Sequence, residues 1–337
     1  MLNNKSILIT GGTGSFGKKF VSKVIKNYKP KKLIIYSRDE LKQFEMQKLF
    51  PEEKYKFLRY FIGDVRDFER LKIASKSIDI IIHAAALKQV PAAEYNPMEC
   101  IKTNVNGADN IIRCALENNI QKVLALSTDK AASPVNLYGA SKLLSDKLFI
   151  SSNNLVGKER TIFSVVRYGN VVGSRGSVLP FFKELIKKKS NKLPITDERM
   201  TRFWITLDQG VNFVINSLKE MKGGEIFIPK MPSIYIKDLA KVLNPKAKLE
   251  IIGIRPGEKL HETMWSIYEA SNVIEFKKYF IIKPVITQHL SKSKIKNFLV
   301  NSKKERAKPV HHDFEYNSLS NTNLLDINAI KKLKDIF

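Results

Sequence analysis

The stretch "SILITGGTGSFGKKF", residues 6–20, decides the fold class of this chain. It opens with an apolar run typical of a buried strand, and a helical pattern follows over residues 16–27. Gly11, Gly14 and Gly17 occupy the junction. Glycines at such a strand-to-helix turn let backbone N–H groups approach a phosphate at the positive end of the helix. The stretch therefore predicts a phosphate-binding loop that opens a βαβ unit.

Short apolar runs alternate with helical patterns through the first half of the chain. This alternation is typical of a parallel sheet covered by helices on both faces. We expect helices near residues 40–49, 98–118 and 138–151. We expect strands at residues 6–10, 32–36, 58–64, 78–86, 122–128 and 161–170. The predicted fold class is α/β: a doubly wound parallel Rossmann sheet with a smaller C-terminal α+β lobe for the substrate.

The sequence changes in character after Asn170, where Gly, Pro and Lys become more frequent. A turn, a helix and a strand at about 204–230 then return to the earlier pattern. We therefore predict a dinucleotide-binding Rossmann domain over residues 1–170, with a return segment at about 204–230. The predicted substrate lobe comprises residues 171–203 and 231–337.

The composition is that of a globular protein: the chain has 337 residues, 43% of them apolar, and can bury a large core. The net charge of +25 raises the alternative of a nucleic-acid-binding protein. The lysines are spread along the chain, which favours solvated faces, and no DNA- or RNA-reading module is recognisable. Neither a membrane-length apolar run nor a signal-peptide core is present. We expect a cytoplasmic protein without a membrane span.

Cysteine and histidine positions indicate neither a disulfide nor a metal centre. Cys100 and Cys114 fall in one predicted helix, at a separation of roughly 21 Å for an ideal helix, which is too far for a disulfide. We therefore expect packed free thiols, as in a reducing compartment. His311 and His312 form an isolated pair near the end of the chain and are predicted to lie on the surface.

The end of the second predicted strand indicates which dinucleotide binds. An acid there would read the ribose 2′-hydroxyl of NAD, whereas this chain has Ser37 and Arg38, with Lys42 one turn later. These residues suit a 2′-phosphate, so we predict NADP. Asp64, after the third strand, suits the adenine amine. The predicted cofactor contacts are Gly11, Thr13, Gly14, Ser15, Phe16, Gly17, Ser37, Arg38, Lys42, Asp64, Val65, Ala84, Ala85, Ala86, Lys88, Asn104, Tyr138 and Lys142.

A tyrosine–lysine pair follows the fifth predicted strand in "STDKAASPVNLYGASK", residues 127–142. Tyr138 and Lys142 share one helical face, and a nearby cation lowers the pKa of a phenol. Tyr138 is therefore a candidate base for a hydroxyl proton when hydride leaves the same carbon. Thr128, at the end of the strand, is placed to hold the same hydroxyl.

A second acid–base pair, Asp129 and Lys130, stands at the carboxyl end of the same strand. Ligands bind at this end of the strands in open α/β sheets. Oxidation of a sugar at C4 makes its C5 proton acidic, so a base there can remove it while an acid protonates O6 and releases water. The cofactor can then return its hydride to C6. The pair therefore predicts a 4,6-dehydration, with a structural salt bridge as the alternative interpretation.

Long stretches of the sequence up to about residue 263 resemble the inverting UDP-N-acetylglucosamine 4,6-dehydratases of pseudaminic acid biosynthesis, in the extended short-chain dehydrogenase/reductase superfamily. The similarity weakens beyond residue 265, and Gln89 stands where such enzymes often have histidine. The similar stretches are "GGTGSFG", "YSRDELKQFEM", "GDVRD", "AEYNPMECIKTN", "STDKA", "NLYG", "RYGNVVGSRGSV", "PITDERMTRFWI", "GGEIFIPK" and "RPGEKLHE".

The resemblance implies a role for each reacting residue. Asp129 would be the acid, Lys130 the C5 base and Tyr138 the C4 base, with Lys142 and Thr128 assisting. UDP-N-acetylglucosamine would be the substrate, the product an L-arabino 4-keto sugar, and the assembly a homo-oligomer, a hexamer. The predicted substrate contacts are Lys88, Lys130, Tyr138, Asn170, Arg202, Arg255 and Glu258.

Two other classes of function remain open from the sequence. A nucleotide-sugar 4-epimerase, or a related 4,6-dehydratase of polysaccharide biosynthesis, would use the same fold, because fold alone does not fix chemistry. A 4-epimerase needs no C5 base or O6 acid, so Asp129 and Lys130 favour the dehydratase. A non-enzymatic NADP-binding or nucleic-acid-binding protein is disfavoured by the intact set of Thr128, Tyr138 and Lys142.

Overall fold

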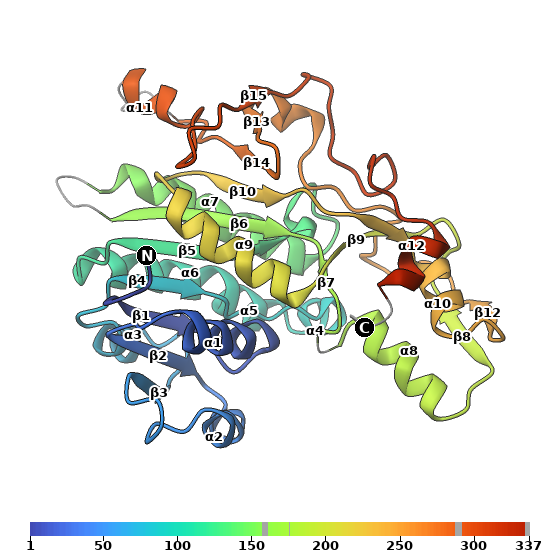
Figure 1. The fold of residues 1–337 in the computed structure, drawn as a ribbon, viewed down its shortest axis with the longest axis horizontal. Helices are drawn as coiled ribbons and strands as arrows, with labels where there is room; N and C mark the ends of the chain where they lie inside the picture. Colours follow the sequence, from blue (N-terminus) through green and yellow to red (C-terminus); the bar gives the residue numbers. More distant parts are fainter. Residues whose placement is uncertain (157–160, 175, 287–291, 334–337) are drawn as a thin grey trace.

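The computed structural model describes residues 1–156, 161–174, 176–286 and 292–333. A ten-stranded sheet dominates this part of the chain, in the order β15-β13-β14-β10-β6-β5-β4-β1-β2-β3 (Figure 1). From β3 to β10 every neighbouring pair is parallel. The parallel strands are β1 (Ser6–Thr10), β2 (Lys32–Ser37), β3 (Leu58–Ile62), β4 (Ile80–His83), β5 (Lys122–Thr128), β6 (Ile162–Tyr168) and β10 (Ile226–Pro229). The predicted doubly wound α/β fold is confirmed.

Helices cover both faces of this sheet. On one face α1 (Ser15–Asn27) packs against α9 (Leu207–Glu220), and on the other α3 (Phe68–Ala74), α6 (Gly107–Glu117) and α7 (Leu137–Ser151) form a row (Figure 1). The helix α9 begins with a capping box in which Thr206 and Gln209 satisfy each other's backbone N–H groups. The return segment predicted at about 204–230 thus supplies one helix and one strand of the main layer.

The helix predicted over residues 98–118 is interrupted by a π-helical turn. It consists of α5 (Pro97–Ile101), the π turn Lys102–Asn106 and α6. Such turns aim a side chain that a regular helix would rotate away, and here Asn104 points to the loop after β4. Cys100 and Cys114 are both buried and free, which confirms the expectation of packed thiols.

Three strands from the part of the chain that the sequence interpretation assigned to the substrate lobe extend the main sheet. β14 (Tyr279–Ile282) pairs antiparallel with β10, β13 (Val273–Glu275) pairs with β14, and β15 (Lys308–Pro309) with β13. Without β14, the edge of β10 would expose unpaired backbone groups, and covering such an edge blocks pairing with other chains. The C-terminal part of the chain therefore protects the edge of the Rossmann sheet.

The smaller lobe contains two small sheets and several short helices. One sheet has the order β11-β9-β7 and the other pairs β12 with β8. The remaining helices and strands, some of which lie outside the smaller lobe, are α2 (Glu40–Leu49), α4 (Val90–Tyr95), β7 (Asn170–Val171), α8 (Val178–Lys187), β8 (Lys192–Ile195), β9 (Thr201–Ile205), β11 (Ser233–Tyr235), α10 (Ile236–Leu243), β12 (Lys248–Ile251), α11 (Lys292–Asn297) and α12 (Ile327–Lys332).

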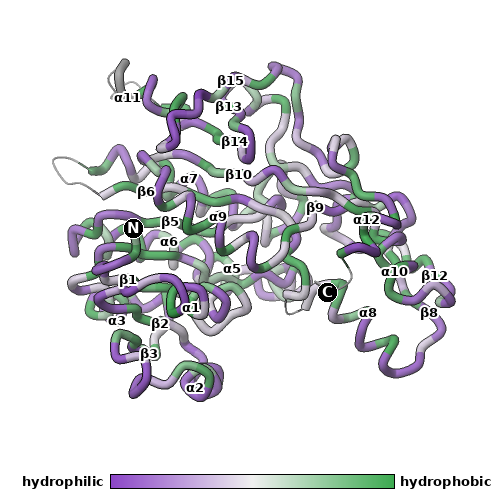
Figure 2. Tube along the Cα trace, viewed as in Figure 1, coloured by the Kyte–Doolittle hydropathy of each residue, from purple (hydrophilic) through white to green (hydrophobic). Residues whose placement is uncertain are grey.

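The main hydrophobic core lies between the large sheet and its helices, where Figure 2 shows the apolar central strands. Every residue of β1, β4 and β10 is buried, as expected for strands covered on both faces. Trp265 and Tyr316, from the last part of the chain, join this same core. Among the described residues, no helix combines the length and apolarity needed to cross a membrane.

Candidate active site

The loop between β1 and α1 has the geometry of a phosphate cradle. Gly11 has a positive φ of 62°, and a Cβ there would lie 2.9 Å from the Ala85 backbone. A Cβ at Gly17 would lie 2.1 Å from the carbonyl oxygen of Gly12. Gly14 caps α1 without any side-chain hydrogen bond to the first-turn N–H groups. Because those groups meet no capping side chain, the predicted loop fits the pyrophosphate of a dinucleotide.

At the end of β2, the two predicted cofactor residues differ in exposure. The hydroxyl of Ser37 is buried and pairs with that of Thr13 at 2.9 Å. The Arg38 side chain is 51% exposed and lies 3.4 Å from Asp64. The ammonium of Lys42 pairs with Asp39, which caps α2. Arg38 is therefore the freest cation at this position to meet a 2′-phosphate.

The carboxylate of Asp64, predicted to contact adenine, is bound mainly by an arginine. Arg66 donates two side-chain hydrogen bonds to it, at 2.7 and 3.0 Å, and one from its backbone. Burial raises the pKa of Asp64, but these hydrogen bonds and the charges of Arg66 and Arg38 leave it below its usual value. Asp64 therefore stays ionised. Val65, beside it, is buried in the core.

The loop after β4 is fixed next to the phosphate cradle. The hydroxyl of Thr10 accepts hydrogen bonds from the backbone of Ala84 and Ala85, both at 3.2 Å. Asn104 holds Leu87 through both its amide oxygen and its amide nitrogen, at 2.8 and 2.9 Å. Asn104, predicted as a cofactor contact, thus has its side chain engaged with the protein. Ala86 and Lys88, from the same loop, are exposed.

Four predicted catalytic side chains meet at the end of β5. Thr128 donates a hydrogen bond to Asp129 at 2.9 Å and is also hydrogen-bonded to Tyr138. The Lys130 ammonium lies 3.1 Å from the same Asp129 oxygen. The second oxygen of Asp129 is buried without a hydrogen-bond partner among the described residues. Acid, amine and phenol therefore form one cluster, as the sequence predicts.

Lys142 has a different environment from the one expected. Its ammonium is buried and donates to the carbonyl oxygen of Leu126 at 2.7 Å. Burial raises the pKa of Tyr138 to about 12, and the opposing cation is Lys130. Burial also lowers the pKa of Lys142, against the charge of Asp146. The protein alone therefore keeps the Tyr138 phenol protonated, because desolvation outweighs the nearby positive charge.

Glu262 belongs to the active-site cluster, although the sequence interpretation assigned it no role. Its carboxylate is 2% exposed and lies 3.1 Å from the Lys130 ammonium. Glu262 ends the stretch "RPGEKLHE", residues 255–262, of which only Arg255 and Glu258 were selected. The sequence offered one indication of a role for Glu262, namely a second acid in a stretch already assigned to the substrate. Its contact with Lys130 could not be predicted from the sequence, because it joins distant parts of the chain.

The predicted substrate residues fall into two groups. Arg202 is buried and donates to the carbonyls of Thr201 and Leu260, close to the catalytic cluster. The amide oxygen of Asn170 is buried without a hydrogen-bond partner among the described residues. Arg255 and Glu258 instead form an ion pair of 2.9 Å, in which the arginine is 61% exposed. The last two are therefore placed to meet a ligand from the surface.

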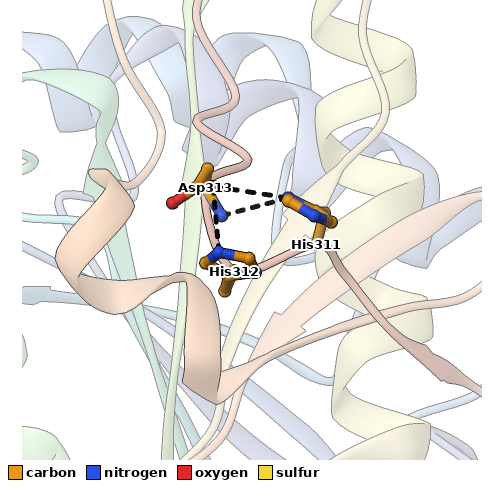
Figure 3. Close-up of side chains that lie close together, drawn as sticks. All are labelled: His311, His312 and Asp313. Carbon is orange, nitrogen blue, oxygen red and sulfur yellow. Dashed lines mark hydrogen bonds and ion pairs between the residues drawn. The ribbon is translucent and has the colours of Figure 1, made fainter.

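The side chains of His311, His312 and Asp313 lie close together (Figure 3). All three are exposed, as predicted for the two histidines. One possible metal-binding atom from each lies within 4.8 Å of the others. His312 pairs with Asp313 at 3.0 Å. All three are consecutive residues on the surface, outside the cluster at β5, and we assign them no part in catalysis.

Comparison with known proteins places the chain in a family. The model of the family described as polysaccharide biosynthesis protein matches residues 7–284. The chain belongs to the polysaccharide biosynthesis protein family. Its fold is that of the extended short-chain dehydrogenase/reductases, which confirms the resemblance drawn from the motifs.

Relatives with similar sequences carry different names. A UDP-N-acetylglucosamine 4,6-dehydratase (inverting) from Campylobacter jejuni is 57% identical, over 95% of this chain and 94% of that protein. A UDP-glucose 4-epimerase from Rickettsia bellii is 40% identical, over 99% of this chain and 96% of its own. The X-ray structure of Pen from Bacillus thuringiensis superimposes with a TM-score of 0.87 and 37% identity, covering 99% and 98% of the two chains.

Proposed function

We propose that the protein is an NADP-dependent, inverting UDP-N-acetylglucosamine 4,6-dehydratase, a hydro-lyase. The observation that carries this proposal is the contact of Asp129 with Lys130, 3.1 Å apart, beside Tyr138 and Thr128. Hydride chemistry alone needs only Tyr138, Thr128 and Lys142. The high identity to the Campylobacter jejuni dehydratase supports the same assignment. The product is UDP-2-acetamido-2,6-dideoxy-β-L-arabino-hexos-4-ulose, a precursor suited to pseudaminic acid biosynthesis.

The first step is oxidation at C4 of the sugar. Bound NADP supplies the hydride acceptor for C4 and, later, the hydride donor for C6. Thr128 and Tyr138 hold the C4 hydroxyl, and the phenolate of Tyr138 takes its proton. The charge of Lys130 and the hydrogen bond with Thr128 favour this phenolate, against the burial that raises the pKa of Tyr138.

The second step removes water across C5 and C6. Transfer of one proton from the Lys130 ammonium to Asp129, over 3.1 Å, creates a neutral amine and a protonated carboxyl at once. The amine takes the C5 proton, and the carboxyl gives its proton to O6, which leaves as water. Burial raises the pKa of Asp129 and so favours its protonated form. A bound dinucleotide would return hydride to C6 of the C5–C6 double bond, and a proton at C5 would complete the product.

The proposed substrate contacts divide between the two ends of the sugar nucleotide. Arg202 and Arg255 suit the diphosphate, because a guanidinium binds phosphate oxygens through paired hydrogen bonds. Glu258 suits the ribose hydroxyls of uridine. Asn170, with its unsatisfied buried oxygen, and Lys88 complete the set near the sugar. Re-protonation of C5 from the face opposite Lys130 gives the inverted product.

The deciding experiment is mass spectrometry of UDP-N-acetylglucosamine incubated with purified protein and no added cofactor. Loss of one water from the sugar nucleotide is expected. Proton NMR of the product formed in D2O should show an L-arabino sugar with deuterium at C5. The Lys130→Ala variant is the control, and it should yield no dehydrated product. An unchanged substrate mass with the wild type, in the presence of NADP, would refute the proposal.

A second candidate is a UDP-sugar 4-epimerase, favoured by the name of the Rickettsia bellii relative. The same incubation separates the two, because a C4 epimer has the mass of the substrate. The acid–base cluster at β5 favours dehydration, since epimerisation needs neither Asp129 nor Lys130. A C4 epimer that forms equally well with Lys130→Ala would establish the epimerase instead.

We also propose that the enzyme works in the cytoplasm as a homo-oligomer, a hexamer, without nucleic-acid partners. The family resemblance supports the assembly. The net charge of +25 would attract a polyanionic sugar nucleotide, so the charge is explained without nucleic-acid binding. Light scattering during size-exclusion chromatography should give a mass about six times 38.5 kDa, and a monomer mass would contradict this assembly.

A further inference from the structure

Glu262 contributes a second carboxylate to Lys130 from a distant part of the chain. One oxygen of Glu262 lies 3.1 Å from the Lys130 ammonium, and the side chain is 2% exposed. Its other oxygen has no hydrogen-bond partner among the described residues. Asp129 lies against the same ammonium, also at 3.1 Å. Lys130 is therefore held between two buried acids, one directly after β5 and one from the segment of residues 255–262.

The backbone of Glu262 is fixed by the C-terminal part of the chain. Its N–H donates to the Ser318 hydroxyl at 2.9 Å, and its carbonyl accepts the N–H of Ser318 at 2.8 Å. That hydroxyl also pairs with Thr201 of β9 at 2.7 Å. Ser318 is fully buried. This two-sided anchoring aims the Glu262 side chain at the end of β5.

Three cations lie close to the carboxylate of Glu262. Besides Lys130, Arg202 of β9 lies 3.8 Å away and Lys259 of its own segment 4.0 Å away. Of the acids in the described part of the chain, Asp129 interacts with Glu262, and Glu315 interacts with Lys259. Burial raises the pKa of Glu262, but these cations leave it below its usual value. Glu262 therefore stays ionised.

We propose that Glu262 is a positioning residue for the elimination step, which holds the Lys130 amine beside Asp129 and sets the charge state of that pair. The inference rests on the proposed function, because it needs Asp129 and Lys130 as the acid and the base. Glu262 does not touch the sugar in this account. It acts through Lys130, to which it supplies a fixed hydrogen-bond acceptor and a permanent negative charge.

The charge of Glu262 has a definite effect on both members of the pair. Its negative charge raises the pKa of Lys130 and the pKa of Asp129. Removal of that charge must lower both, so each protonation step of the pair moves to lower pH. A residue that only supported the fold would change the rate or the stability, and would leave these steps at the same pH.

The test compares the pH dependence of water loss in wild type and in Glu262→Gln, measured by mass spectrometry of the sugar nucleotide. Glutamine keeps the shape and removes the charge. We expect slower water loss, with both limbs of the profile displaced to lower pH by about 1–3 units, the size of a close charge effect on a pKa. Single-turnover C4 oxidation, followed by nicotinamide absorbance, should persist. An unmoved profile would overturn the proposal.

Two further variants complete the design. Glu262→Asp keeps the charge but shortens the reach, so it should slow water loss without moving the profile; an unchanged rate would count against positioning. If Glu262→Gln does not fold, Glu262→Asp still tests whether Glu262 positions Lys130. Glu225→Gln removes another buried carboxylate, hydrogen-bonded to Ser164 at 2.6 Å, and should leave the profile unmoved. Absence of water loss in the wild type would refute the proposed function itself.

Discussion

At the scale of single residues, we propose that cofactor choice depends on one exposed side chain, Arg38. The buried hydroxyl of Ser37 is hydrogen-bonded to that of Thr13, and the ammonium of Lys42 is paired with Asp39. Arg38 is half exposed, with one contact at the limit of hydrogen-bond distance. A flexible guanidinium in this position can turn to a 2′-phosphate at little cost, because it gives up almost no existing interaction.

The Arg38→Ala variant should therefore bind NADP more weakly than the wild type, with little change for NAD. A hydrogen bond to a charged group contributes about 1.5–3 kcal/mol, which corresponds to about tenfold or more in affinity. Isothermal titration calorimetry with both dinucleotides measures the difference. Arg38→Lys is the matched control and should retain part of the preference. An equal loss for both cofactors would show that Arg38 does not read the 2′-phosphate.

At the scale of elements, the contact of β1 with α1 tolerates no side chain at Gly17. A Cβ there would lie 2.1 Å from the carbonyl oxygen of Gly12, which is backbone and cannot rotate away. The helix can approach the strand closely only because Gly17 has no side chain. The same close approach brings the N-terminus of α1 to the phosphate cradle, so packing and binding depend on one residue.

The Gly17→Ala variant should be destabilised by about 1–3 kcal/mol, the usual cost of overpacking a core, and should bind NADP less tightly. Urea unfolding followed by circular dichroism measures the first effect. The control is Gly210→Ala in α9, where a Cβ meets nothing within 4 Å. Because alanine favours helix over glycine by about 1 kcal/mol, that variant should be as stable as the wild type or more so. Equal behaviour of both variants would contradict the packing argument.

At the scale of the whole molecule, a buried ion pair joins the Rossmann sheet to the segment after "RPGEKLHE". Arg167 of β6 pairs with Asp146 of α7 at 3.1 Å, and both side chains are almost fully buried. Arg167 also donates to the carbonyl of Met264 at 2.7 Å, two residues after Glu262. Ser127 donates to Asp146 at 2.7 Å. One buried cation thus connects the sheet, helix α7 and the segment that follows Glu262.

The Asp146→Asn variant should lose about 3–5 kcal/mol of stability, because it leaves the Arg167 charge buried without its counter-ion. Urea unfolding at neutral pH measures the loss. Glu184→Gln breaks the exposed pair of Glu184 with Lys188 on α8 and serves as the control. It should leave the urea midpoint almost unchanged, since exposed pairs contribute little. Similar midpoints for both variants would mean that the buried charge finds water or another partner.

Much of the fold was readable because its signals are local. The apolar run at residues 122–128 is β5 as observed, and the glycine pattern at residues 11–17 identified the turn into α1. The helix at residues 40–49 was also predicted with its observed bounds. In each case propensity, apolar pattern and capping residues point to the same structure over a few neighbouring residues.

What the sequence by itself determined is the parallel sheet, the phosphate loop and the order of acid, base and tyrosine after β5. The tertiary structure alone decided which charges meet. It turned Lys142 toward the Leu126 carbonyl, made Lys130 the main cation acting on Tyr138, and brought Glu262 to Lys130. It also added β14 to the edge of β10. Local patterns set backbone conformation, whereas pairings between distant segments depend on how the whole chain packs. Burial then determines how strongly the paired charges shift each other's pKa values.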